Sequence, residues 1–391
     1  MAASPDVFVE VPSSSDWPGM GRRRIVLSLL AMIIAGAVFV SATSPRVAPF
    51  EWERRTGPRE SINRDSLVAT SDGFGILSGV TVEGVRLWFS ADGETWEASR
   101  TQDSPSQLAT IGADLIGYGV TTGRLISAHA DGWVEAADQI VFPDEVRSRQ
   151  GSGRPSVVGA GEGFVIISLL GEVWWSADGS TFERAVAEPD WGPGQTVDVP
   201  FDSTCRPPST TSPDVPPMVS AETTLVAMVS RNPAAPFGQS PVCEPQIWIS
   251  DEGRSWAEAG TGFEDGDYVY DLAWRDGRFT AVGGRGIGLP AVWTSADARD
   301  WDLVDDIAPL NSVDLYTVEA GGAGWVILGQ ESAGPDTVGW TSGDGLCWTP
   351  LPEEVGGGDT VVSSAQKVMV LDPITVPEIW VGTSTGGAGG C

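Results

Sequence analysis

Tyrosine and carboxylate side chains that could act together occur in one short segment of the chain. It contains Glu264, Asp265, Asp267, Tyr268 and Tyr270. A carboxylate beside a tyrosine can take up its proton, and carboxylate oxygens are also ligands for calcium. The spacing is not that of an EF-hand loop, and alternating tyrosines after a solvated acidic turn are equally typical of a β-strand. The segment is therefore a candidate site with a structural alternative.

Other side chains offer less chemistry. His129 is the single histidine, so it cannot form a histidine-based metal site alone, and no pair of the four cysteines has zinc spacing. The glycine-rich run 283–288 lies between two predicted strands, where no helix N-terminus is available for a phosphate. We therefore expect no metal and no cofactor.

A heptapeptide that returns along the chain predicts the elements that hold these residues. Ser-Ala-Asp-Gly-Glu-Thr-Trp starts at residue 90, related heptapeptides start at 176, 250, 295 and 342, and a short apolar run with a tryptophan precedes each. An aspartate accepts hydrogen bonds from backbone N–H groups just after it, glycine tolerates positive φ, and the last residue starts a new strand. Each copy therefore predicts a hairpin between antiparallel strands.

This heptapeptide resembles the Asp-box (BNR) repeat, S-x-D-x-G-x-x-W, of sialidase-like β-propellers and their non-enzymatic relatives. The resemblance covers about residues 50–383 and implies the scaffold rather than an activity. It also implies a structural role for the repeated acids, each of which would cap its own hairpin: Asp92, Asp178, Asp251, Asp297 and Asp344.

The tryptophan that opens each unit gives the number of blades. It lies at positions 88, 174, 248, 293, 340 and 380, so the last three steps are 45, 47 and 40 residues, the length of one four-stranded blade. The first step is two blades long and contains a degenerate unit at 125–133, whereas the second is one blade with insertions. We expect an all-β, seven-bladed β-propeller over 50–383, in which 50–55 is the closing strand of the last blade, followed by a glycine-rich tail at 384–391.

The N-terminal part predicts a membrane anchor. Residues 25–42 carry no charge and follow three arginines, which predicts a transmembrane helix with 1–24 in the cytoplasm and 43–49 as a linker. A cleaved signal peptide is the alternative, because 40–42 are small residues suited to cleavage. The first case gives a single-pass protein of the cell membrane and the second a secreted one, with the propeller outside the cytoplasm in both.

Propeller topology predicts the cysteine pairs and the exposed face. Cys205 and Cys243 fall on the face opposite the Asp-box turns, which we call the outward face, and Cys347 and Cys391 on the Asp-box face. We expect the pair Cys205–Cys243 and also Cys347–Cys391, with a free thiol at the C-terminus as the alternative. The long proline-rich linker on the outward face makes Trp191 a binding candidate, unless it is a tolerated insertion.

Charge and motif content then decide between classes of function. The formal net charge of −30 argues against nucleic acid and anionic lipid as ligands. The resemblance implies that a sialidase-like enzyme would need several arginines, a Tyr–Glu nucleophile pair and an Arg-Ile-Pro motif, yet the nearest trace of that motif is Arg154 before a proline. We expect a membrane-anchored binding or assembly module whose outward face takes a protein or glycan ligand. The alternative is a divergent exo-glycosidase built from Arg154, Glu264, Tyr268 and Tyr270.

Overall fold

A computed structural model describes most of residues 50–385. Residues 1–49 and 386–391 lie outside the described part, as do several internal segments, the longest of which are 136–155, 185–216 and 232–243. The chain divides into two units, Met1–Arg46 and Val47–Cys391, and only the second contains described residues. The predicted membrane segment 25–42 is therefore outside the description. Among the described residues, no helix is long and apolar enough to cross a membrane.

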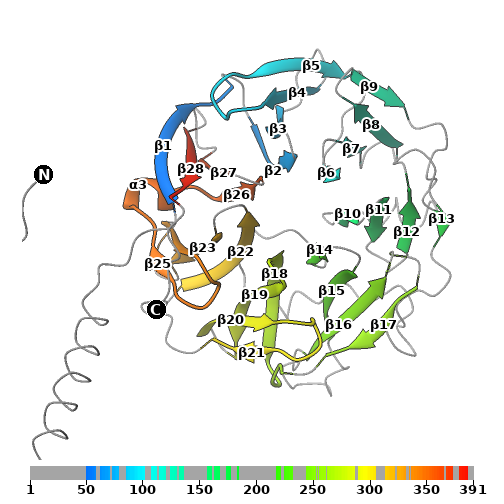
Figure 1. Cartoon of the computed structure of the whole chain (residues 1–391), viewed down its shortest axis with the longest axis vertical. Coiled ribbons are helices and arrows are strands. Elements are labelled where there is room, and N and C mark those ends of the chain that lie inside the picture. Colours follow the sequence, from blue (N-terminus) through cyan, green and yellow to red (C-terminus); the bar gives the residue numbers. More distant parts are fainter. Residues whose placement is uncertain are drawn as a thin grey trace, which may run out of the picture. The chain divides into compact units, whose positions relative to one another are not determined.

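The described strands form seven four-stranded antiparallel sheets, shown in Figure 1. We call each sheet a blade and number the blades in chain order. The first three blades consist of β2 (Ile62–Thr70), β3 (Gly73–Ser78), β4 (Val85–Ser90) and β5 (Glu97–Thr101); β6 (Gln107–Ile111), β7 (Asp114–Gly119), β8 (Arg124–His129) and β9 (Gly132–Glu135); and β10 (Ser156–Ala160), β11 (Gly163–Ile167), β12 (Val173–Ser176) and β13 (Glu183–Arg184).

The next three blades follow the same order from their first to their fourth strand. They are β14 (Met218–Ala221), β15 (Thr224–Arg231), β16 (Glu244–Asp251) and β17 (Ala257–Ala259); β18 (Asp267–Arg275), β19 (Arg278–Arg285), β20 (Leu289–Ser295) and β21 (Asp302–Leu303); and β22 (Val313–Gly321), β23 (Gly324–Glu331), β24 (Thr337–Ser342) and β25 (Thr349–Pro350). A single helical turn, α3 (Glu353–Gly356), leads to blade 7.

Blade 7 joins the two ends of the described chain. It contains β26 (Thr360–Ser363), β27 (Lys367–Asp372) and β28 (Glu378–Ser384), and its fourth strand is β1 (Phe50–Thr56). β1 pairs antiparallel with β28, with Arg54 opposite Trp380, as the sequence predicts. The first strand of each blade packs against the first strand of the next, and β26 packs against β2. The blades therefore close into a ring (Figure 1) and leave no open end between the first and the last.

Apolar side chains between neighbouring blades make up the core. One cluster joins Ile247 of blade 4 to Leu272 and Trp293 of blade 5, and another joins Phe74 of blade 1 to Met369 of blade 7. The large rings of Trp293 and Trp325 are almost completely buried, and each belongs to a cluster that joins two neighbouring blades. Burial between blades explains why each repeat needs its neighbours for stability.

Candidate functional site

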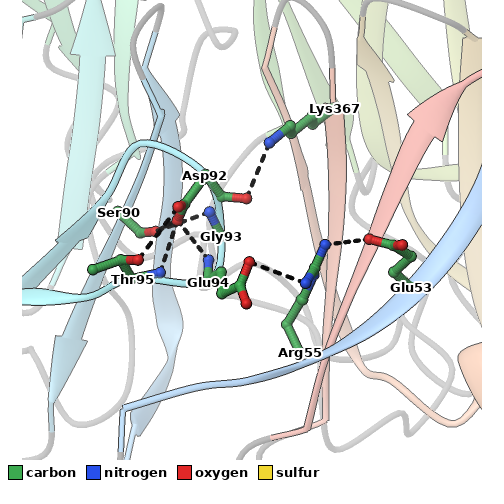
Figure 2. A network of polar contacts seen from close by, with 8 residues as sticks. All are labelled: Glu53, Arg55, Ser90, Asp92, Gly93, Glu94, Thr95 and Lys367. Atoms are coloured by element: carbon green, nitrogen blue, oxygen red, sulfur yellow. Dashed lines mark hydrogen bonds and ion pairs between the residues drawn. The ribbon is translucent and has the colours of Figure 1, made fainter.

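The turn that the predicted Asp-box heptapeptide forms in blade 1 is closed by hydrogen bonds from its backbone to its own side chains (Figure 2). Asp92 Oδ1 accepts hydrogen bonds from the backbone N–H groups of Glu94 at 2.8 Å and Thr95 at 2.7 Å. Ser90 Oγ also donates to Asp92 Oδ1, and it accepts from Gly93 N–H at 2.8 Å. The bonds from Thr95 and Glu94 lower the pKa of Asp92 to about 2. This carboxylate therefore holds the hairpin as an anion.

The same bonds recur in two further turns. Asp297 accepts from the N–H groups two and three residues on at 2.8 and 3.0 Å, and Asp344 accepts from the corresponding groups at 2.9 Å each. Asp178 lies outside the described residues. Asp251 needs a correction of register: Gly253 has φ +76°, like Gly93 at +79°, so Asp251 occupies the place of Ala91 and not that of Asp92.

The glycine position of the turn touches the preceding blade. A Cβ at Gly93 would lie 2.9 Å from Cγ2 of Val381 in blade 7, and one at Gly253 would lie 2.4 Å from Cγ2 of Val165 in blade 3. Ala298 holds this position in blade 5 with φ +59° and is completely buried. The turn therefore both closes its hairpin and packs one blade against the one before it.

Polar contacts reinforce this packing where the ring closes. Lys367 of blade 7 donates from Nζ to the backbone oxygen of Asp92 at 3.1 Å. Arg55 on β1 forms an ion pair with Glu94 at 3.0 Å and another with Glu53 (Figure 2). The Asp-box residues that we can place are therefore engaged in the scaffold, which directs the search for a site to the opposite face.

The predicted tyrosine segment lies at the outward end of blade 5. The turn before β18 is closed by Asp267, which accepts from Glu264 N–H at 2.8 Å. Asp267 is buried, and Arg285 approaches its carboxylate to 3.4 Å while also pairing with Glu264. Burial is the main reason that the pKa of Asp267 is raised. Two of the predicted acids thus converge on an arginine that the sequence had not singled out.

The two tyrosines are core residues. Tyr268 and Tyr270 are 7% and 9% exposed, and their rings meet edge to face with centroids 5.2 Å apart. The Tyr268 hydroxyl lies over Gly284, where a Cβ would come within 2.1 Å of it. Burial, and then the charge of Asp314 in blade 6, raise the pKa of Tyr268 to about 12. Such a phenol is a weak nucleophile because its anion is disfavoured.

Most other candidates lie outside the described residues. These are Arg154, Trp191, Cys205, Cys243 and Cys391. Cys347 takes part in a disulfide bond whose partner is not among the described residues, so the pair Cys347–Cys391 stays a prediction. In the part of the chain that the structure describes, no group of three His, Cys, Asp or Glu side chains could hold a metal ion.

Three charged residues that the sequence analysis missed lie on or next to β18. They are Arg285, Asp271 and Asp314. The first strands of blades 5 and 6 have the same irregularity in strand pairing, which directly follows Val269 in β18 and Leu315 in β22. Aligning the two strands at this irregularity would have placed Tyr268 at the position of Asp314. That signal lies in the repeat and not in any motif.

Comparison with known proteins identifies the fold. At 10% identity, virginiamycin B lyase from Staphylococcus aureus aligns with a TM-score of 0.55 over 85% of this chain and 99% of its own. The WD40 β-propeller domain of Doa1 has 12% identity and a TM-score of 0.51, over 85% of this chain and 97% of its own. The propeller domain of the Trilobed protease from Pyrococcus furiosus has 8% identity and a TM-score of 0.52, over 84% of this chain and 97% of its own. The chain is a β-propeller. No protein-family model and no curated protein matches its sequence. These similarities establish the fold alone, because propellers carry unrelated functions.

Proposed function

We propose that this chain is a seven-bladed propeller of the Asp-box type, held at the cell membrane by residues 25–42, that binds a protein or glycan through its outward face without turnover. Three arguments support the proposal: the chemistry of the tyrosine segment, the surface at the outward end of blade 5, and the end of β28 at which β1 begins.

The observation that carries the proposal is the environment of Tyr268. A tyrosine nucleophile needs a base that takes its proton, and its hydroxyl must reach the substrate. Here the hydroxyl packs over Gly284, and the pKa of about 12 opposes ionisation. Glu264, the candidate base in the sequence, instead pairs with Arg285. Both features favour binding over glycosidase chemistry.

The outward end of blade 5 also offers an apolar contact. Leu289 begins β20 and is 65% exposed, whereas the other large exposed apolar residue among those described, Leu346, is 42% exposed in the Asp-box turn of blade 6. β20 runs from Leu289 to Ser295 and then into its own Asp-box turn, so residues 289 and 346 lie on opposite faces. Leu289 lies opposite Arg285 in the pairing of β19 and β20, so an exposed apolar side chain and a charged one are neighbours at this end of the blade.

The anchor gives the binding face its direction. β1 follows residues 43–49 directly and begins opposite Ser384, at the Asp-box end of β28. If 25–42 span the bilayer, the chain therefore enters the propeller from the Asp-box face. The outward face then points away from the membrane, where a partner can reach it.

Hydrolysis of a panel of fluorogenic glycosides, sialosides included, tests the absence of turnover. The purified chain is compared with two variants, Tyr268→Phe and Arg154→Ala. We expect no hydrolysis above a buffer blank from any of the three. Hydrolysis by the parent chain that either variant loses would refute the proposal and establish the glycosidase alternative. Membrane extraction of the full chain, with residues 25–42 replaced by a cleavable signal peptide as control, tests the anchor.

A further inference from the structure

Two carboxyl groups, those of Asp271 on β18 and Glu319 on β22, lie on the packed first strands of blades 5 and 6. Asp271 Oδ2 accepts hydrogen bonds from Thr317 Oγ1 at 2.7 Å and from the backbone N–H of Val318 at 3.0 Å. One residue beyond Val318, Glu319 Oε2 accepts from Ser363 Oγ of blade 7 at 3.0 Å. A line of hydrogen bonds through acidic side chains thus connects three consecutive blades.

Among the described residues, neither acid has a basic partner. Both side chains are half-buried. Desolvation is the largest cause of the raised pKa of each carboxyl, which is about 6 for Asp271 and about 8 for Glu319. The charge of Asp271 adds to the rise at Glu319. The groups that favour ionisation are hydroxyl and backbone N–H donors alone, in the part of the chain that the structure describes.

The charged residues of the neighbouring strands lie at strand ends. Arg275 pairs with Asp276 beyond the end of β18, Arg285 pairs with Glu264 and Asp267, and the Arg278 side chain lies near Gly345. β14 and β26, which pack on the outer sides of β18 and β22, carry no charged residue. The remaining charged residues on strands that contact β18 or β22 are Arg231, Glu244, Asp251, Asp314 and Glu331.

We propose that Asp271 and Glu319 form a proton-operated latch between the first strands of blades 5, 6 and 7. In mild acid both carboxyls are neutral, so the hydrogen bonds join the strands with no repulsion between the two acids. As pH rises, Asp271 ionises first and Glu319 second, and the two like charges then repel each other between the packed strands. The repulsion weakens the junction of these blades at the centre of the ring.

The direction of the pH effect follows from proton linkage. In the folded chain the pKa of each carboxyl lies above its ordinary value, which is 3.8 for Asp271 and 4.5 for Glu319, so each binds its proton more tightly than it does in the unfolded chain. The folded state therefore holds more protons than the unfolded state between about pH 4 and 8, and stability falls as pH rises through this window. Because each side chain keeps some accessible surface, solvent screens part of the penalty, and we expect the pair to lower the unfolding temperature by about 2–5 °C.

Thermal unfolding of the full chain at pH 5, 7 and 8.5, followed by tryptophan fluorescence at one scan rate, tests the latch. Glu319→Gln and Asp271→Asn, alone and combined, are compared with Asp336→Asn, an exposed control that carries the same loss of charge. We expect the parent chain and Asp336→Asn to lose stability alike as pH rises. Glu319→Gln should flatten the fall, and Asp271→Asn should move its midpoint to lower pH.

Two results would overturn the latch. One is a dependence of unfolding temperature on pH that is the same in the parent chain and in all variants. The other is a double variant whose change in stability equals the sum of the two single changes, because coupled charges give non-additive effects. If Glu319→Gln does not fold, Ser363→Ala keeps the question open to measurement. It removes the hydroxyl that favours the ionised Glu319, so the fall in stability should become steeper, and an unchanged slope would count against the latch.

Discussion

Replacing Gly93 with alanine should destabilise the propeller at the seam where the ring closes. The residue has φ +79°, a conformation that costs an L-amino acid about 1–2 kcal/mol. The added Cβ would also lie 2.9 Å from Val381 Cγ2 and 3.2 Å from Met369 Cε, and overpacking of this kind costs about 1–3 kcal/mol. Partial relaxation of the flexible Met369 reduces the sum. We expect a loss of about 2–4 kcal/mol in the free energy of unfolding.

Blade 5 supplies the matched control, because Ala298 already occupies this position. Ala298→Gly removes the strain of φ +59° but also a buried methyl group, two effects of about 1 kcal/mol and opposite sign. Urea unfolding of residues 47–391, monitored by tryptophan fluorescence, gives both differences. The reasoning fails if Gly93→Ala lies within 0.5 kcal/mol of the parent chain, roughly the scatter of neutral surface changes, or if Ala298→Gly is the more damaging substitution.

Three further predictions concern the scaffold. Because the pKa of Asp92 is lowered to about 2, its contribution is present above about pH 4 and is lost as pH falls towards 2, so Asp92→Ala should lower the unfolding midpoint at pH 7 and make little difference at pH 2. A chain that starts at residue 57 lacks β1, exposes the edge of β28, and should elute as aggregates in size-exclusion chromatography, whereas a chain from residue 47 stays monodisperse. Gly284→Ala should destabilise the chain more than Gly277→Ala, because a Cβ at Gly284 would meet the Tyr268 hydroxyl. A Cβ at Gly277 meets nothing within 4 Å, so Gly277→Ala carries only the strain of a positive φ. Equal unfolding midpoints would contradict this packing.

Repetition made the scaffold predictable. The heptapeptide and its preceding tryptophan place a hairpin and a strand in each copy, and the short strand-like segment before blade 1 could be assigned to blade 7 because that blade lacked a fourth strand. The described strands form as many sheets as the tryptophan spacing predicts blades. The register error at Asp251 arose because that copy has an acid one position early, and the positive φ of Gly253 locates the turn correctly.

The candidate site was harder to predict, for a physical reason. Strand alternation would turn Tyr268 and Tyr270 to the same side of a regular strand, but the pairing of β18 and β19 shifts between Val269 and Asp271. Both rings are buried and meet edge to face, an environment that the alternation pattern alone does not indicate. The pairing of Asp271 with Glu319 depends on the register of two strands that share no hydrogen-bonded sheet, and no local pattern reports that register.

The central claim is that the outward face binds a partner, and site-specific photocrosslinking in intact cells tests it most directly. A photoreactive phenylalanine analogue replaces Leu289 on the outward face in one variant and Leu346 on the Asp-box face in a matched one. The account predicts a discrete crosslinked species from position 289, which a reversal of charge on the same face, Glu264→Arg, abolishes, and none of comparable yield from 346. Crosslinking from 346 alone, or from neither position, would contradict it.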